Sequence, residues 1–303
     1  MAARLVRLNA YALLLTTSIA TAQTPPDFSG TWTFGSLTPL ARPEALADKS
    51  HFTEEEALEF ETNFDTYIRK IFKEEAGDDF VGDDMWLDFG SYVEPDLRTS
   101  RIIDPPDGRF PEATEKGQAL MQKFRAARES YAGPEVLGQN ERCIMANIPY
   151  LRAPDNNMLT IVQTDDHLLL NREFAYGYRI IDLKNKVFPP ADMKFWRGAS
   201  VSQWQDDTLI VETRNMHPEF GIGPTGPDLV LHESFQLTTE DYLKYELTVT
   251  SPEYQKSAWT MRTYMRRSVH KNYEYACHEG NFRNMQGILA GQRLLDAEAA
   301  AAD

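Results

Sequence analysis

Three runs near the C-terminus decide the fold: LVLHESFQL (229–237), YLKYELTVT (242–250) and AWTMRTYMR (258–266). Each run is mostly β-branched, aliphatic or aromatic, which is typical of β-strands. Links of four residues (238–241) and seven residues (251–257) join them. Consecutive strands with such short links must be antiparallel, because a parallel pair needs a crossover of a dozen or more residues.

The same pattern extends toward the N-terminus. DFSGTWTF (27–34) predicts an opening strand, since Trp32 and Phe34 alternate with polar residues after a glycine. Seven or more strands in a meander favour a closed or strongly curled barrel, because closure removes exposed strand edges. The predicted fold class is therefore mainly β with helical additions. The remaining predicted strands are LTIVQ (159–163), HLLLNREF (167–174), YRIIDL (178–183) and TLIVETR (208–214).

Helical periodicity adds three further elements. The first begins at a capping box formed by Thr53 and Glu56. Together with the strands, this pattern predicts a single β-barrel domain over 23–303, with a helical insertion at about 50–130. The predicted helices lie near 52–73, 113–128 and 282–298.

The first 22 residues are typical of a cleavable signal peptide. Arg4 and Arg7 form a positive start, an apolar run (11–20) follows, and Ala20-Thr21-Ala22 is an A-x-A cleavage site. The apolar run is too short for a membrane span, which needs about 20 residues. We therefore expect export to the periplasm or the cell exterior, with cleavage after Ala22 and no membrane insertion afterwards.

The charge balance bears on the kind of partner. The chain carries 46 acidic against 31 basic residues, a net charge of −15. A surface this acidic repels phosphate backbones and anionic lipid, which disfavours nucleic-acid and peripheral-membrane roles. A small-molecule ligand or substrate is the expected partner. Nothing in the composition indicates an oligomeric state.

The chain has two cysteines, Cys143 and Cys277. Two thiols in an oxidising compartment usually pair, so we expect a disulfide between them. The alternative is a catalytic or redox thiol, which needs a depressed pKa and a nearby base. His278 follows Cys277 directly and keeps that alternative open.

Motifs for phosphate, zinc and serine chemistry do not fit this sequence. Gly221, Gly223 and Gly226 match G-x-G-x-x-G, but two prolines interrupt the run and a strand follows, so no helix N-terminus meets a phosphate. The segment GASVS (198–202) lacks the final glycine of a nucleophile elbow. A P-loop and an H-E-x-x-H zinc helix are also missing from the sequence. We therefore expect no cofactor and no metal.

Two His-Glu pairs are the catalytic candidates. Successive side chains of a strand face opposite ways, so Glu233 shares the apolar face of Leu231 and Phe235. His232 lies on the other face. A carboxylate on an apolar face must be paired, protonated or functional, because an isolated buried charge is too costly. Glu233 is therefore either a site carboxylate or the partner of an arginine. The candidate arginines are Arg179, Arg262 and Arg266.

The second pair, His278 and Glu279, follows Cys277 in the chain. A disulfide there would hold both side chains rigidly, which suits catalysis. It equally suits a structural role, in which the histidine caps the last helix or hydrogen-bonds a carbonyl.

Aromatic side chains over the predicted strands and their links indicate the class of ligand. Their flat faces and polar tips suit an apolar, aromatic or carbohydrate ligand. Such residues are also typical of a core. The predicted substrate-binding residues are Tyr178, Arg179, Trp196, Trp204, Tyr245 and Trp259.

Four blocks carry a resemblance to a known family: DFSGTW (27–32), DPPDGR (104–109), DDTLIVET (206–213) and YEYACHEGN (273–281). From about Asp27 to Arg293 the chain resembles a family of exported bacterial proteins common in proteobacteria and acidobacteria. The resemblance implies export and a β-rich, lipocalin-like barrel, and it assigns no catalytic residue. The family commonly has a Gly-Asp-Ser run after its tryptophan. Here Trp196 is followed by Arg197, Gly198, Ala199 and Ser200.

Two functions remain open from the sequence. One is a cofactor-independent lyase, isomerase or cyclase, in which Glu233 or His278 moves a proton; the carboxylate on an apolar face supports it. The other is an exported protein that binds a small ligand without altering it. The lack of a complete catalytic constellation supports this second function.

Overall fold

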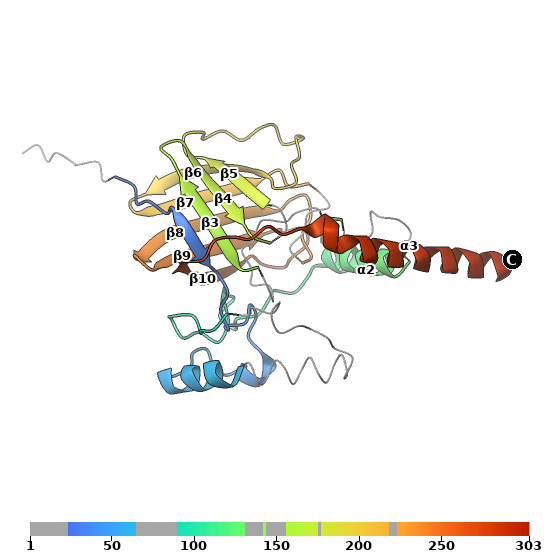
Figure 1. Ribbon diagram of the computed structural model, residues 1–303, viewed down its shortest axis with the longest axis horizontal. Coiled ribbons are helices and arrows are strands. Elements are labelled where there is room, and N and C mark those ends of the chain that lie inside the picture. Colours follow the sequence, from blue (N-terminus) through green and yellow to red (C-terminus); the bar gives the residue numbers. More distant parts are fainter. Residues whose placement is uncertain are drawn as a thin grey trace, which may run out of the picture.

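The computed structural model describes residues 24–64, 90–130, 142–143, 156–174, 177–217 and 223–302 (Figure 1). Its helical elements are η1 (Glu44–Leu46), a helix over 54–64, α2 (Glu115–Ser130) and α3 (Cys277–Ala302). Its strands are β1 (Gly30–Thr33), β2 (Ile102–Asp104), β3 (Met158–Gln163), β4 (His167–Arg172), β5 (Gly177–Asp182), β6 (Ala199–Gln205), β7 (Thr208–Arg214), β8 (Val230–Thr239), β9 (Tyr242–Thr250) and β10 (Trp259–Ser268).

Nine of these strands form an antiparallel, nearly closed barrel in the order β5-β4-β3-β1-β10-β9-β8-β7-β6. Within β3–β5 and within β6–β10, strands that follow one another in the chain pair antiparallel, and β1 links the two groups by pairing with β3 and β10. β2 pairs with the start of β10. Along their described residues, no backbone ladder joins β5 to β6, so the barrel has a seam there. The predicted antiparallel barrel is confirmed.

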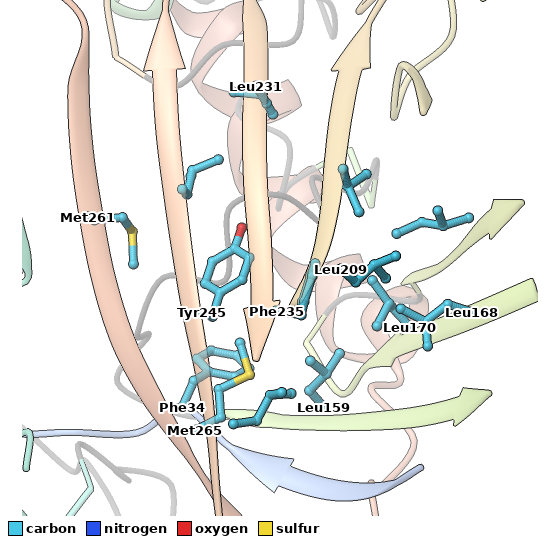
Figure 2. Close-up of a cluster of buried hydrophobic side chains, with 14 of the residues drawn as sticks. Phe34, Leu159, Leu168, Leu170, Leu209, Leu231, Phe235, Tyr245, Met261 and Met265 are labelled. Carbon is cyan, nitrogen blue, oxygen red and sulfur yellow. The ribbon is translucent and has the colours of Figure 1, made fainter. Parts of the chain in front are cut away.

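Alternate residues of each strand fill the barrel interior. On β9, Leu243, Tyr245, Leu247 and Val249 are fully buried, while the residues between them are half-exposed. The same alternation runs along β8 and β10, as the period of two predicts. Figure 2 shows side chains from β3, β4 and β7–β10 meeting in one cluster. The middle of the barrel is therefore a packed hydrophobic core.

The helix over 54–64 begins as predicted. The backbone N–H of Thr53 donates to Glu56 Oε2 at 2.8 Å, and that of Glu56 donates to Thr53 Oγ1 at 3.2 Å. Phe52, Ala57 and Val93 pack in a second, smaller hydrophobic cluster. The remainder of this predicted helix, to residue 73, lies outside the described residues.

A buried ion pair attaches the segment before β2 to the barrel. Glu94 accepts hydrogen bonds from Thr263 Oγ1 at 2.6 Å and from the backbone N–H of Tyr264 at 2.8 Å, both on β10. Arg101 Nε lies 3.4 Å from Glu94 Oε1, and Arg101 also donates to the carbonyl of Phe34. Burial raises the pKa of Glu94, and the charge of Arg101 opposes that shift. This ion pair fixes the N-terminal segment against β10.

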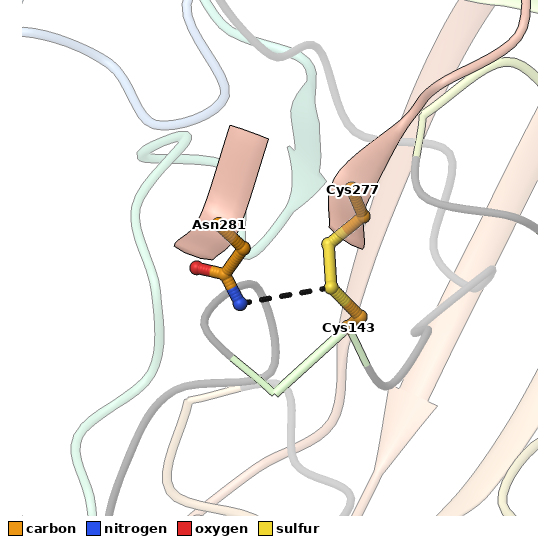
Figure 3. Close-up of a disulfide and its surroundings, with 3 residues drawn as sticks. All are labelled: Cys143, Cys277 and Asn281. Carbon is orange, nitrogen blue, oxygen red and sulfur yellow. Dashed lines mark hydrogen bonds between the residues drawn. A yellow bond between two sulfur atoms is a disulfide. The ribbon is translucent and has the colours of Figure 1, made fainter. Parts of the chain in front are cut away.

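The predicted disulfide is present. The sulfur atoms of Cys143 and Cys277 are bonded, and Asn281 Nδ2 lies 3.7 Å from Cys143 Sγ (Figure 3). α3 starts at Cys277, earlier than the predicted 282, and leads away from the barrel (Figure 1). α2 begins two residues after the predicted start at 113.

None of the helices in the described part of the chain combines the length and apolar character that crossing a bilayer requires.

Candidate functional site

Side chains bridge the seam where β5 and β6 lack a ladder. Ser202 Oγ donates to the carbonyl of Asp182 at 3.2 Å. Lys186 Nζ donates to the carbonyl of Ser202. Farther along the seam, the guanidinium of Arg197 donates to the carbonyl of Tyr178. The seam is therefore held by side-chain hydrogen bonds instead of a β-ladder.

Arg179 points from β5 into the barrel and is 4% exposed. Its Nη2 donates to Ser200 Oγ on β6 at 3.0 Å and to Thr213 Oγ1 on β7 at 2.8 Å. Its Nη1 and Nη2 donate to the two carboxylate oxygens of Glu233 on β8, at 3.0 and 2.7 Å. The hydroxyl of Tyr245 on β9 donates to Glu233 Oε1 at 2.9 Å. One buried network thus joins five strands on both sides of the seam.

Both oxygens of Glu233 are occupied, and its side chain has no exposed surface. If Arg179 moved out of this contact, Glu233 would remain buried with an uncompensated charge. Of the two roles that the sequence left open for Glu233, the structure therefore shows the pairing with an arginine, and that arginine is Arg179.

The hydroxyls of Ser200 and Thr213 lie 3.0 Å apart, and each accepts a hydrogen bond from Arg179. One hydroxyl donates to the other, so one hydroxyl proton remains for a further acceptor. Thr213 is fully buried, whereas Ser200 is half-exposed. Where Thr213 is the donor of this pair, the hydroxyl proton of Ser200 is left for a further acceptor.

The outer side of the seam is a cleft of about 360 Å³. Tyr178 and Ile180 are 60% and 56% exposed and give it apolar surface. The guanidinium of Arg197 lies 5.7 Å from the centre of the Tyr178 ring. Cationic, hydroxyl and apolar groups thus meet in one cleft, which suits a small organic molecule. Its lining residues are Tyr178, Arg179, Ile180, Phe195, Arg197, Gly198, Ala199 and Ser200.

The backbone holds Phe195 at the cleft. Its N–H donates to the carbonyl of Asn215 at 3.0 Å, and its carbonyl accepts from the N–H of His217 at 2.8 Å. Phe195 also forms a parallel bridge with Met216. The chain that enters β6 is thereby tied to the end of β7.

Gly198 shapes the same side of the cleft. Its φ is +67°, and an added Cβ would lie 2.6 Å from the carbonyl oxygen of Arg214 and 2.7 Å from Thr213 Cγ2. Gly223 has the same φ, but a Cβ added there would meet nothing within 4 Å.

We expect Gly223→Ala to lower the free energy of unfolding by about 1–2 kcal/mol through backbone strain alone. Gly198→Ala should lose about 1 kcal/mol more, because its Cβ is overpacked. Denaturant unfolding measures the loss of stability in both variants. Equal losses in Gly198→Ala and Gly223→Ala would contradict the close contact around Gly198.

His232 and Glu233 face opposite ways, as the strand period indicates. Glu233 is buried in the barrel, while the side chain of His232 is 50% exposed. His232 Nε2 lies 3.8 Å from Glu212 Oε2 on the outer face of the neighbouring strand β7. The structure does not bring this histidine to the buried carboxylate.

His278 and Glu279 lie in the first turn of α3, and both are exposed. Cys277 precedes them and is engaged in the disulfide, so its sulfur is not a free thiol. Glu233 is buried inside the barrel, so these two exposed residues do not join it in one site.

The predicted substrate-binding residues lie in different places. Tyr178 and Arg179 line the cleft. Trp196 stacks on His217 with ring centres 4.0 Å apart, beside the cleft residues Phe195 and Arg197 in the chain. The other three belong to the core: Tyr245 and Trp259 are fully buried, and Trp204 packs against the core cluster.

The sequence predicted two of the eight cleft residues, Tyr178 and Arg179. It missed the other six, which are Ile180, Phe195, Arg197, Gly198, Ala199 and Ser200. The run FWRGAS (195–200) held the available signal, since it places an arginine and a glycine directly after two aromatic residues. Its role depends on the seam, which no local pattern reveals.

Across the described ranges, no three or more His, Cys, Asp or Glu side chains gather in a way that could hold a metal ion.

Comparisons with known proteins add little. No family model matches the chain, and no curated protein does. Among solved structures, it is similar to a single-residue mutant of the fluorescent protein UnaG, at 16% identity and a TM-score of 0.24, over 44% of this chain and 87% of that one. It is also similar to a secretary abundant heat soluble protein from Ramazzottius varieornatus, at 11% identity and a TM-score of 0.20, over 52% and 90% of the two chains. Neither likeness bears on what this chain binds.

Proposed function

We propose that the protein binds a small organic anion with an apolar body in the cleft at the β5–β6 seam, without altering it. One observation carries the proposal: Arg197 and Ser200 lie in the same cleft as the exposed Tyr178 and Ile180. A guanidinium recognises a carboxylate or sulfonate through two parallel N–H donors. The apolar side chains then cover the rest of the ligand.

Size and charge support this class of ligand. Ligand pockets usually measure 300–1,000 Å³, so a cleft of about 360 Å³ suits a small molecule. The chain as a whole carries a net charge of −15, which repels anions from most of its surface. The charge of Arg179 is balanced by Glu233, so Arg197 supplies the cation that makes this cleft a distinct place for an anion to bind.

Binding fits the geometry better than general acid-base catalysis. Glu233 is engaged by Arg179 and Tyr245 and has no exposed surface from which to exchange a proton with a substrate. A general base must lie within hydrogen-bond reach of the proton that it takes. His232, His278 and Glu279 face away from this carboxylate or lie on α3.

A fluorescent anion tests the proposal. We expect the purified protein to bind 8-anilinonaphthalene-1-sulfonate, and Arg197→Met to raise the Kd about tenfold or more, because a hydrogen bond to a charged group contributes about 1.5–3 kcal/mol. The neutral analogue N-phenyl-1-naphthylamine should bind both proteins alike. Fluorescence titration measures all four affinities.

Lys194→Met is the matched control. Lys194 is exposed, lies three residues earlier in the chain and does not line the cleft. The control removes the same charge, so it should leave the affinity for the sulfonate within about twofold of wild type. An unchanged Kd in Arg197→Met, or an equal loss in both variants, would reject the cleft as the anion site.

The disulfide supports export as part of the proposal. A bonded pair such as Cys143–Cys277 is typical of proteins that fold in an oxidising compartment. The predicted signal peptide, residues 1–22, lies outside the described residues.

A further inference from the structure

α3 is a 26-residue helix that leads away from the barrel (Figure 1). Much of its apolar surface faces solvent, since Leu294 is 66% exposed and Leu295 is 44% exposed. Exposed apolar surface of this extent on a helix marks a contact that another chain can cover.

A groove of about 450 Å³ runs along one face of α3. At Gly287 and Gly291 an added Cβ would meet nothing within 4 Å, so the floor of the groove is open. An apolar side chain from another helix can therefore enter here and approach the backbone closely. The groove is lined by Gly287, Ile288, Gly291, Leu294, Leu295 and Glu298.

Four residues along one side of this groove are arranged symmetrically. At 100° per residue, Arg283, Gly287, Leu294 and Glu298 fall within about 60° of arc on the helix. The midpoint between Arg283 and Glu298 is also the midpoint between Gly287 and Leu294. Arg283 and Glu298 therefore lie at equal distances on either side of one point. Gly287, which leaves a gap, and the bulky Leu294 lie at equal distances on either side of the same point.

We propose that this face binds the same face of a second copy of the chain, with the two α3 helices antiparallel about that point. Leu294 of each copy then lies on Gly287 of the other and fills the groove. Arg283 of each copy lies opposite Glu298 of the other. Such an interface is isologous, because the same residues serve on both sides of a two-fold axis.

The length of α3 agrees with this arrangement. In the antiparallel register, the last helical residue, at 302, lies opposite Glu279 of the other copy, close to the start of its helix at Cys277. The pair overlaps over almost the whole helix, about 36 Å at 1.5 Å per residue. A single helix pair falls at the small end of protein interfaces, so we expect a Kd in the micromolar range.

The oligomeric state tests the surface. Sedimentation equilibrium of the purified protein at 5–200 µM should show a reversible dimer, and Leu294→Glu should raise its Kd at least tenfold, because it puts a carboxylate against the groove and beside Glu298. Leu289→Glu is the matched control, since Leu289 is also exposed and lies on the opposite side of α3. It should dimerise like wild type.

Charge reversal tests the antiparallel register. Arg283→Glu and Glu298→Arg should each weaken the dimer, because each places like charges opposite one another, and the double variant should restore it. A parallel pair would place Arg283 against Arg283 and would gain nothing from the double change. A monomer at 200 µM, loss of the dimer in Leu289→Glu, or no recovery in the double variant would overturn the proposal. None of these residues lines the seam cleft, so the result is independent of ligand binding.

Discussion

Glu233→Gln is expected to lower the free energy of unfolding by about 3–5 kcal/mol at pH 7, because the substitution leaves Arg179 as a buried charge without its counter-ion. Arg179 holds both carboxylate oxygens, and the two side chains are 3% and 0% exposed. Denaturant unfolding followed by fluorescence and circular dichroism measures the change. Replacing both partners with apolar residues should recover most of the loss, because it removes both buried charges.

A partly exposed ion pair supplies the control. Arg262 Nε lies 2.6 Å from Glu246 Oε1 across β9 and β10, but both side chains are nearly 30% exposed. Glu246→Gln makes the same chemical change and should cost less than about 1 kcal/mol. Equal losses for Glu246→Gln and Glu233→Gln would show that burial does not set the cost. A stable Glu233→Gln protein would show that this carboxylate is not holding the arginine.

Loss of the disulfide is the second large effect. The bond between Cys143 and Cys277 closes a loop of 134 residues, and removing it with serines should lower the free energy of unfolding by about 5 kcal/mol, since the unfolded chain regains that freedom. Unfolding of the double serine variant beside wild type measures this loss. Thiol titration of the denatured, unreduced wild type should find no free cysteine. Two titratable thiols would contradict the bond.

Much of the barrel could be predicted because its strands carry local signals. The alternation along β9 and β10 and the short links between strands specify antiparallel hairpins, and the structure has them. β6 was not predicted, because its inward positions include Ser200 and Ser202 and its pattern is polar. The polar character follows from its place beside the seam and the buried Arg179, which a local pattern does not contain.

The candidate site was predictable only in part. The period of two placed Glu233 on the buried face and His232 on the exposed face, and both placements are confirmed. The choice of Arg179 as its partner was not available, because that residue is 54 positions earlier and approaches across the barrel. Arg197 was missed for a similar reason: it reaches the cleft only because β5 and β6 lie side by side without a ladder.

The place of β1 between β3 and β10 constrains how the chain reaches its final form. Thr31 pairs with Thr160 on one side and with Ser268 on the other. Residue 31 is synthesised long before residue 268, so β1 cannot complete its pairing until β10 has been made. Contacts so far apart in the chain form slowly. A chain shortened before β10 would therefore keep open strand edges on both sides of the missing strand, and such edges promote association with other chains.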